Sequence, residues 1–147
     1  MNGLKLRDVE KSDQDLIFNW RNLDELVSLS AHKRKVSKIE HQEWFTGALE
    51  DSLKILKIIC YKGRDIGLIK SEKINLSCEI SIYLIPIYQG KGMGKTSLKM
   101  FIDLYKTKCI VFTAKVQSNN HPSKKMFAAL GFKIVEDKKS LLTFALE

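Results

Sequence analysis

One segment decides the fold class of this chain, Tyr88-Gln89-Gly90-Lys91-Gly92-Met93-Gly94-Lys95-Thr96. It stands between a strand expected at 77–84 and a helix expected at 95–106, so its amides lie at a helix N-terminus. The helix dipole favours an anion there, and glycines let phosphates approach the backbone without a clash with Cβ. Three glycines alternate over five residues. The segment is therefore predicted to hold a group that carries phosphates.

Two common phosphate loops do not fit this segment. A nucleotide P-loop has the pattern G-x-x-x-x-G-K-[ST], and Gln89 stands where its first glycine is required. The apolar strand expected at 109–116 also lacks a terminal Asp to serve Mg²⁺. A dinucleotide loop has the pattern G-x-G-x-x-G and belongs near the first strand of a βαβ unit. Here the glycines stand at 90, 92 and 94, in mid-chain.

A third pattern does fit. Gln89, Gly92 and Gly94 match [QR]-x-x-G-x-[GA], which resembles the acetyl-CoA pyrophosphate loop of the GNAT N-acetyltransferase superfamily. The stretch 79–84 stands where that family has its fourth strand. The stretch 120–132 is an Asn, a short helix and then Leu-Gly-Phe, and it is similar to the family's second conserved block. The resemblance covers nearly the whole chain.

The expected elements agree with that family from end to end. Apolar periodicity and turn residues predict the order β-α-α-β-β-β-α-β-α-β-β without a linker or repeat. Ser12 and Asp13 are expected to cap the first helix, and Ser37 with Glu40 the second; 28–38 is expected to be a loop. The resemblance implies one mixed α/β GNAT domain over 1–147. Its central, mostly antiparallel sheet has six to seven strands, splayed strands 4 and 5, and about four flanking helices.

The resemblance also implies how acetyl-CoA is held as co-substrate. Backbone groups of the fourth strand bind the pantetheine amides, the loop amides hold the pyrophosphate, and an Asn fixes the arm near the thioester. The expected cofactor-binding residues are Ile82, Tyr83, Leu84, Gln89, Gly90, Lys91, Gly92, Met93, Gly94, Lys95, Asn120, Ser123 and Phe127.

Glu79 is the candidate catalytic base, because several family members carry a carboxylate close to this position. On a strand, Glu79, Ser81 and Tyr83 share one face. The alternative is a carboxylate that is merely solvated or ion-paired. Many relatives protonate the departing thiolate with a Tyr where this chain has Phe127, so water, Tyr83 or Tyr88 has that task, or the thiolate leaves unassisted. Direct transfer is expected, because no cysteine stands beside a histidine.

The acceptor region is expected in the first two helices. The segments 18–22, 32–35 and 41–45 resemble sequences of the GNAT branches that acetylate UDP-linked 4-amino sugars and protein N-termini. An aromatic and basic pocket suits a flat base and a diphosphate, which favours a nucleotide sugar. Trp20, Arg21, Asn22 and His41 are the expected acceptor contacts. The alternatives are that Trp20 and Trp44 are core residues, or that the protein is a non-catalytic binder of acyl-CoA or nucleic acid.

Composition adds limits to these expectations. A net charge of +8 suits a polyanionic cofactor; nucleic acid is disfavoured because 32–38 contains no aromatic residue.

Cys60, Cys78 and Cys109 are expected to be free thiols in a reducing compartment, and the histidines lack metal-ligand spacing, so no metal is expected. No signal core and no membrane-length apolar stretch is present. A cytoplasmic small-molecule acetyltransferase is expected, and a homodimer is left open.

Overall fold

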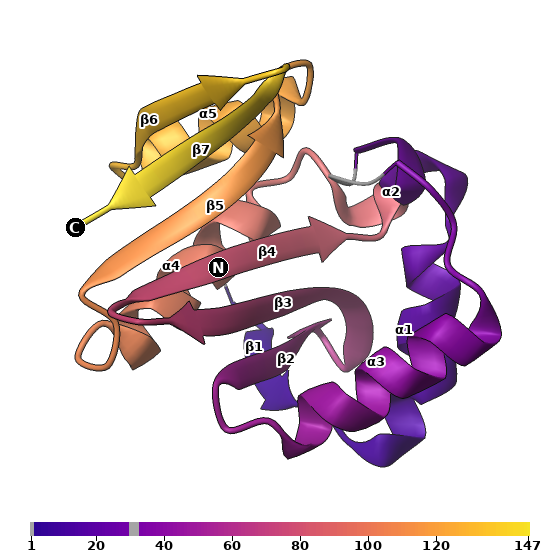
Figure 1. Ribbon diagram of the computed structural model, residues 1–147. Coiled ribbons are helices and arrows are strands. Elements are labelled where there is room, and N and C mark those ends of the chain that lie inside the picture. The colour runs from indigo at the N-terminus through magenta and orange to yellow at the C-terminus, as the bar shows by residue number, and fades with distance from the viewer. Residues whose placement is uncertain (1, 30–32) are drawn as a thin grey trace.

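The computed structural model describes residues 2–29 and 33–147. In this part of the chain, seven strands form one sheet in the order β1-β2-β3-β4-β5-β7-β6 (Figure 1). Neighbouring strands are antiparallel, except that β4 and β5 are parallel. The strands are β1 Leu4–Asp8, β2 Lys54–Tyr61, β3 Arg64–Ile74, β4 Ser77–Leu84, β5 Val111–Gln117, β6 Lys133–Lys138 and β7 Leu141–Leu146. The predicted mixed sheet is confirmed, with seven strands among the described residues.

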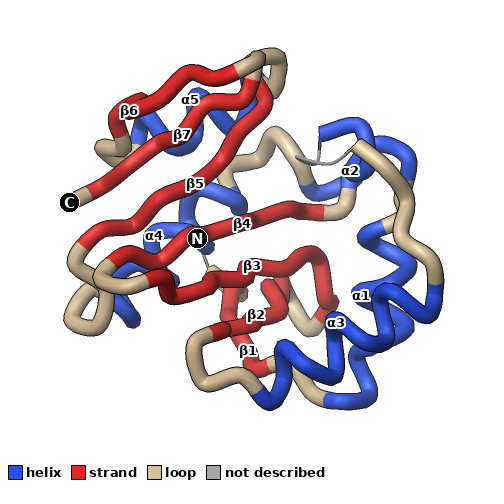
Figure 2. Tube along the Cα trace, in the orientation of Figure 1, coloured by secondary structure: helices blue, strands red, loops and turns tan. Residues whose placement is uncertain are grey.

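Helices cover both faces of the sheet (Figures 1 and 2). The α-helices are α1 Gln14–Arg21, α2 Asp24–Leu29, α3 Lys38–Glu50, α4 Met93–Tyr105 and α5 His121–Ala129, and short 3₁₀ turns lie at η1 Lys11–Asp13 and η2 Pro86–Tyr88. The α2 helix was not expected, because its six residues bury only Leu26 and carry little periodicity. Among the described residues, no helix combines the length and apolar character needed to cross a membrane.

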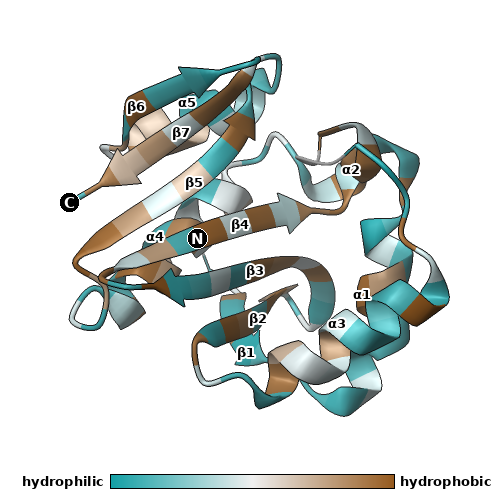
Figure 3. Cartoon of the chain, viewed as in Figure 1, coloured by the Kyte–Doolittle hydropathy of each residue, from teal (hydrophilic) through white to brown (hydrophobic). Residues whose placement is uncertain are grey.

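The two faces of the sheet bury separate clusters of side chains. Ile59, Ile69 and Ile80 pack with Leu98 and Phe101 of α4 on one side. On the other side the strand residues Ile58 and Leu68 pack with Ile17, Trp20 and Phe45 from α1 and α3. Strand residues therefore alternate between a face covered by α4 and α5 and a face covered by α1 to α3. Figure 3 shows hydrophobic stretches along the inner strands of the sheet.

The N-terminal cap of α3 is confirmed and that of α1 is corrected. Ser37 accepts a hydrogen bond from the Glu40 amide at 3.1 Å, and Glu40 accepts one from the Ser37 amide at 3.2 Å. Asp13 precedes α1 but makes no such cap. Its carboxylate accepts from the Glu10 amide at 2.8 Å and from Arg7, and both interactions draw it away from the α1 amides.

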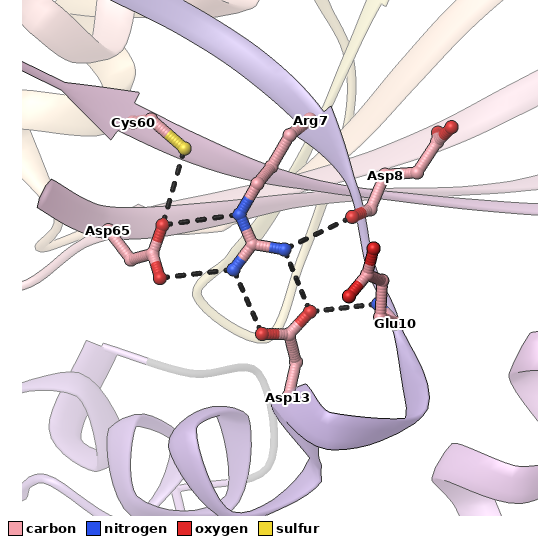
Figure 4. A network of polar contacts seen from close by, with 6 residues as sticks. All are labelled: Arg7, Asp8, Glu10, Asp13, Cys60 and Asp65. Atoms are coloured by element: carbon pink, nitrogen blue, oxygen red, sulfur yellow. Dashed lines mark hydrogen bonds and ion pairs between the residues drawn. The ribbon is translucent and has the colours of Figure 1, made fainter. Parts of the chain in front are cut away.

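Arg7 joins three elements through two carboxylates (Figure 4). Its guanidinium donates to Asp13 of η1 through two bonds of 2.9 Å, and to Asp65 of β3 at 3.2 and 3.0 Å. Asp65 also accepts from the Cys60 thiol at 3.3 Å. Hydrogen bonding to Arg7 lowers the pKa of both carboxyl groups. The network fixes the start of α1 against the sheet.

Cys78 and Cys109 form a disulfide bond, which corrects the expectation of free thiols. The parallel pairing of β4 with β5 begins at Ser77 and Val111. This pairing brings residues 31 positions apart in sequence to a Cα separation of 5.8 Å. Cys109 precedes β5, whereas the sequence placed it in the strand. Among the described residues Cys60 is the free cysteine, so the cysteine argument for a reducing compartment no longer holds.

Candidate active site

The β4 and β5 strands part from each other after a short paired stretch. Their ladder joins Ser77–Glu79 only to Val111–Thr113, although β4 continues to Leu84 and β5 to Gln117 (Figure 1). Over its whole length β4 pairs with β3 on its other edge. The backbone of β4 beyond Glu79 therefore has one edge that β5 does not occupy. The expected splay of these two strands is confirmed.

A glycine loop follows β4 and opens directly into α4. Gly90 and Gly92 have φ values of 75° and 82°, a left-handed conformation that glycine adopts without steric cost. Gly92 is the N-cap, and the first bond of the helix runs from the Thr96 amide to its carbonyl at 3.2 Å. The amides of residues 93–95 lie ahead of that bond. They are the donors a pyrophosphate requires. The expected start of the helix at 95 is therefore two residues late.

The other motif residues hold this loop in place. The Gln89 side chain donates to the Leu84 carbonyl at 2.8 Å, which returns the loop to the end of β4. A Cβ on Gly94 would lie 3.3 Å from the Met126 sulfur, so glycine allows α4 to pack closely on α5. The Met93 side chain is buried in the core, whereas Lys91 and Lys95 are exposed beside the amides. A Cβ on Gly90 would meet nothing within 4 Å, so the loop is open on that side.

The family model of the Acetyltransferase (GNAT) domain matches residues 4–133. The chain belongs to the GNAT acetyltransferase family. Its activity is acetyl-CoA-dependent N-acetyl transfer, and the loop before α4 fits the pyrophosphate of that co-substrate. No protein of curated function matches the sequence.

Solved GNAT structures share the fold at low sequence identity. Spermidine N-acetyltransferase from Vibrio cholerae, in complex with CoA and spermine, has a TM-score of 0.84 and 20% identity, covering 99% of this chain and 96% of that chain. The ribosomal L7/L12 alpha-N-protein acetyltransferase RimL, in complex with CoA, gives 0.83 and 16%, covering 99% and 94%. The Campylobacter jejuni N-acetyltransferase PseH gives 0.74 and 22%, covering 99% and 98%. The TM-scores establish a common fold, and the low sequence identities leave the acceptor open.

Residues of the second GNAT block have structural partners of their own. Asn120 caps α5 and accepts a hydrogen bond from the Ser123 amide at 3.3 Å. The Phe127 ring is buried, with centroids 5.0 Å from Phe132 and 5.8 Å from Phe144. Phe127 therefore belongs to the core under β7. Cofactor contacts by these residues stay predictions.

Glu79 lies where β4 and β5 separate, because it is the last residue of β4 in their ladder. Its cross-strand partner on β3 is Glu72, and in the same pairing Ser81 lies opposite Lys70 and Tyr83 opposite Leu68. This is the face that α1 to α3 cover. A small pocket of about 140 Å³ opens there, lined by Trp44, Lys54, Leu56, Lys70, Ser71, Glu72, Glu79 and Ser81. An amine in that pocket would lie on the opposite side of the sheet from α4.

Three of the four expected acceptor contacts have structural partners. Trp20 is buried edge-on against Tyr83, with ring centroids 6.2 Å apart. Asn22 exchanges two 2.8 Å bonds with the backbone of Val36. The His41 ring nitrogen Nε2 lies 3.2 Å from the Gln14 carbonyl, and burial lowers the pKa of His41. These three residues are not among those that line the pocket.

Arg21 and Lys70 each lack an ion pair among the described residues. The Arg21 Nη1 atom is buried without a hydrogen-bond partner. The Lys70 Nζ atom lies 5.0 Å from the centroid of the Trp44 ring. Lys70 was not among the expected site residues. The available signal was a lysine directly after the stretch Ile66-Gly67-Leu68-Ile69.

The basic loop is less suited to a ligand than the sequence indicated. His32 lies outside the described residues. Arg34 is paired with Glu40 at 3.0 Å, and Lys35 with Asp24 at 3.2 Å, both on the exposed surface. The described residues contain no group of three or more His, Cys, Asp or Glu that could hold a metal ion.

Proposed function

We propose that this N-acetyltransferase acts on a primary amine of a nucleotide-linked amino sugar. The observation that carries the proposal is the charge around the Glu79 pocket. Lys54 and Lys70 line the pocket beside Glu72 and Glu79, and Arg21 lies close enough to lower the pKa of Lys70. Such a pocket favours an acceptor that bears one amine and an anionic group. It disfavours a polyamine, whose several cations would meet Lys70 and Arg21.

In this proposal Glu79 receives the proton of the attacking amine. Acetyl-CoA supplies the acetyl group as a thioester, held by the loop before α4. Glu79 lies at the point where β4 and β5 part and faces the pocket, so a proton can pass to its carboxylate directly or through one water. The Trp44 side chain lines one side of the pocket. Transfer is direct, without an acyl-enzyme, because Cys78 and Cys109 are joined and Cys60 lies beside Asp65.

A thiol-release assay tests the acceptor. The substrates are UDP-linked 4-amino sugars, the matching free amino sugars, peptides with free N-termini, and spermidine. The expected order is nucleotide sugar above free sugar, with little turnover of spermidine. Efficient turnover of peptides without turnover of nucleotide sugars would instead support a protein N-terminal acetyltransferase. Equal turnover of free and UDP-linked sugars would contradict recognition of the phosphates.

A further inference from the structure

Two hydrogen-bond donors on the acceptor side of the sheet have no acceptor. Arg21 Nη1 and the Tyr83 hydroxyl are buried, and neither has a hydrogen-bond partner. Buried polar atoms are nearly always paired, and leaving one unpaired is costly, more so on a charged group. A ligand with acceptor atoms at this place would pair both donors.

Both donors lie beside Lys70. On β3 and β4 the cross-strand pairs are Leu68 with Tyr83 and Lys70 with Ser81, so Tyr83 is the diagonal neighbour of Lys70 on the same face. Arg21 ends α1, next to Trp20, whose ring contacts that of Tyr83. Two cations and a phenol from α1, β3 and β4 thus lie near one another, and Lys70 also lines the Glu79 pocket.

The charges of Arg21 and Lys70 are desolvated and repel each other. Burial lowers the pKa of both groups, and the charge of Arg21 lowers that of Lys70 further, while Glu79 and Glu72 oppose the shift. Burial raises the pKa of Tyr83 well above its usual range, so its hydroxyl stays a donor. An anion between these three groups would offset the repulsion in a site where electrostatic interactions are strong.

We propose that Arg21, Lys70 and Tyr83 form an anion-binding subsite that receives a phosphate or diphosphate of the acceptor. A guanidinium, an ammonium and a hydroxyl supply the charge-assisted hydrogen bonds that phosphate oxygens accept. The identity of the acceptor rests on the proposed function, but the subsite itself does not. It replaces the basic loop in the role of phosphate ligand, because Arg34 and Lys35 are already paired.

The CoA phosphates have a separate site. The helix α4 that follows the glycine loop packs on one face of the sheet, whereas Tyr83 and Trp20, the neighbour of Arg21, pack in the cluster on the α1 to α3 face. Binding of a probe to protein already saturated with CoA therefore reports on the subsite alone.

Calorimetry with UDP and with inorganic pyrophosphate, at saturating CoA, tests the subsite. Lys70→Met and Arg21→Met are each expected to weaken UDP binding roughly tenfold or more, the loss of one charge-assisted contact. Lys70→Arg should retain most of the affinity. Lys35→Met is the control and should bind UDP like the wild type, because its ion pair with Asp24 is exposed. Thermal melts verify that each variant is folded.

Tyr83→Phe separates binding from proton transfer. A subsite role predicts a raised KM for the acceptor with kcat nearly unchanged, whereas a role as acid for the thiolate predicts a lowered kcat. The proposal is overturned if wild-type protein binds neither UDP nor pyrophosphate, or if folded Lys70→Met and Arg21→Met bind them unchanged.

The proposed function can fail separately. If UDP binding depends on Lys70 and Arg21 but no UDP-linked amino sugar is acetylated, the subsite stands and the acceptor is wrong. If amino sugars are acetylated and Lys70→Met leaves their KM unchanged, the acceptor stands and the subsite is wrong.

Discussion

Glu79 and Glu72 face each other across β4 and β3, and both line the same pocket. Only Glu79 also stands in the ladder with β5, at the point where the strands separate. The two carboxylates are thus chemically identical and differ in their distance from the expected thioester. This pair makes the assignment of the base testable with a matched control.

Glu79→Gln is expected to lower kcat by about 10²-fold or more, because a positioned base typically contributes 10²–10⁴-fold. Acetyl-CoA affinity should be unchanged, since the loop before α4 is untouched. Steady-state kinetics with the true acceptor measure this, with Glu72→Gln as the control that retains most activity. A Glu79→Gln enzyme about as active as Glu72→Gln would assign the base elsewhere.

Gly92→Glu is expected to abolish acetyl-CoA binding, because a carboxylate at the α4 N-cap would meet the pyrophosphate. The residue also has a φ of 82°, so part of any loss could come from backbone strain. Gly63→Glu is the matched control, with a φ of 81° in the turn between β2 and β3 and no neighbour within 4 Å. Calorimetry should find the control unchanged; equal affinity in both variants would refute the pyrophosphate site.

At the scale of elements, a disulfide bond joins β4 to the segment before β5, close to the point where the two strands diverge. The Cys78–Cys109 disulfide lies next to Glu79 and where the two strands still pair. It links β4, which carries the proposed base Glu79, to the segment just before β5. A disulfide stabilises mainly by restricting the unfolded chain, and its loss should affect stability more than chemistry.

Reduction of this disulfide is expected to lower the free energy of unfolding by about 2–4 kcal/mol. Urea unfolding with and without dithiothreitol measures the difference. A Cys78→Ala/Cys109→Ala double variant should no longer respond to the reductant, whereas Cys60→Ala should respond like the wild type. Titration of three free thiols in the unreduced, unfolded wild type would show that the bond does not form.

At the scale of the whole molecule, the proposed function assigns two tasks to different sides of the sheet. The helix α4, which the glycine loop precedes, packs on one face, and the pocket that Glu79 lines lies on the face under α1 to α3. The Arg7 network fixes the second layer, because it joins β1 and β3 to η1, from which α1 continues (Figure 4). The network therefore joins the start of α1, the helix that ends at Arg21, to the sheet.

Asp13→Asn is expected to lower the free energy of unfolding at pH 7 by roughly 1–3 kcal/mol, because it breaks a charged contact with Arg7. The folded-state pKa of Asp13 lies below its ordinary value, so the wild-type stabilisation is present above about pH 4 and is lost as pH falls through the folded pKa. Denaturation from pH 7 to 2 should show a weaker acid dependence in the variant. Asp103→Asn, whose pairs with Lys99 and Lys106 are exposed, is the control and should change little. An unaltered acid profile in Asp13→Asn would contradict the role of the network.

The sequence by itself determined the features whose causes are local. The glycine loop, its position before α4 and the Ser37 capping box each depend on residues within about one helical turn. Strand alternation placed Glu79, Ser81 and Tyr83 on one face. Together with the spacing of the two family motifs, these local features were sufficient to predict the fold, the cofactor and the activity.

Only the tertiary structure decided what depends on residues distant in sequence. The Cys78–Cys109 bond, the Arg7 network and the convergence of Arg21, Lys70 and Tyr83 each require particular strand registers. The sequence does not distinguish Lys70 from the other lysines. The strand register pairs it with Ser81, its Nζ atom lies over the Trp44 ring, and it has no ion pair among the described residues. Burial, which changes what such a charge can do, is a property of the assembled layers; no local pattern specifies it.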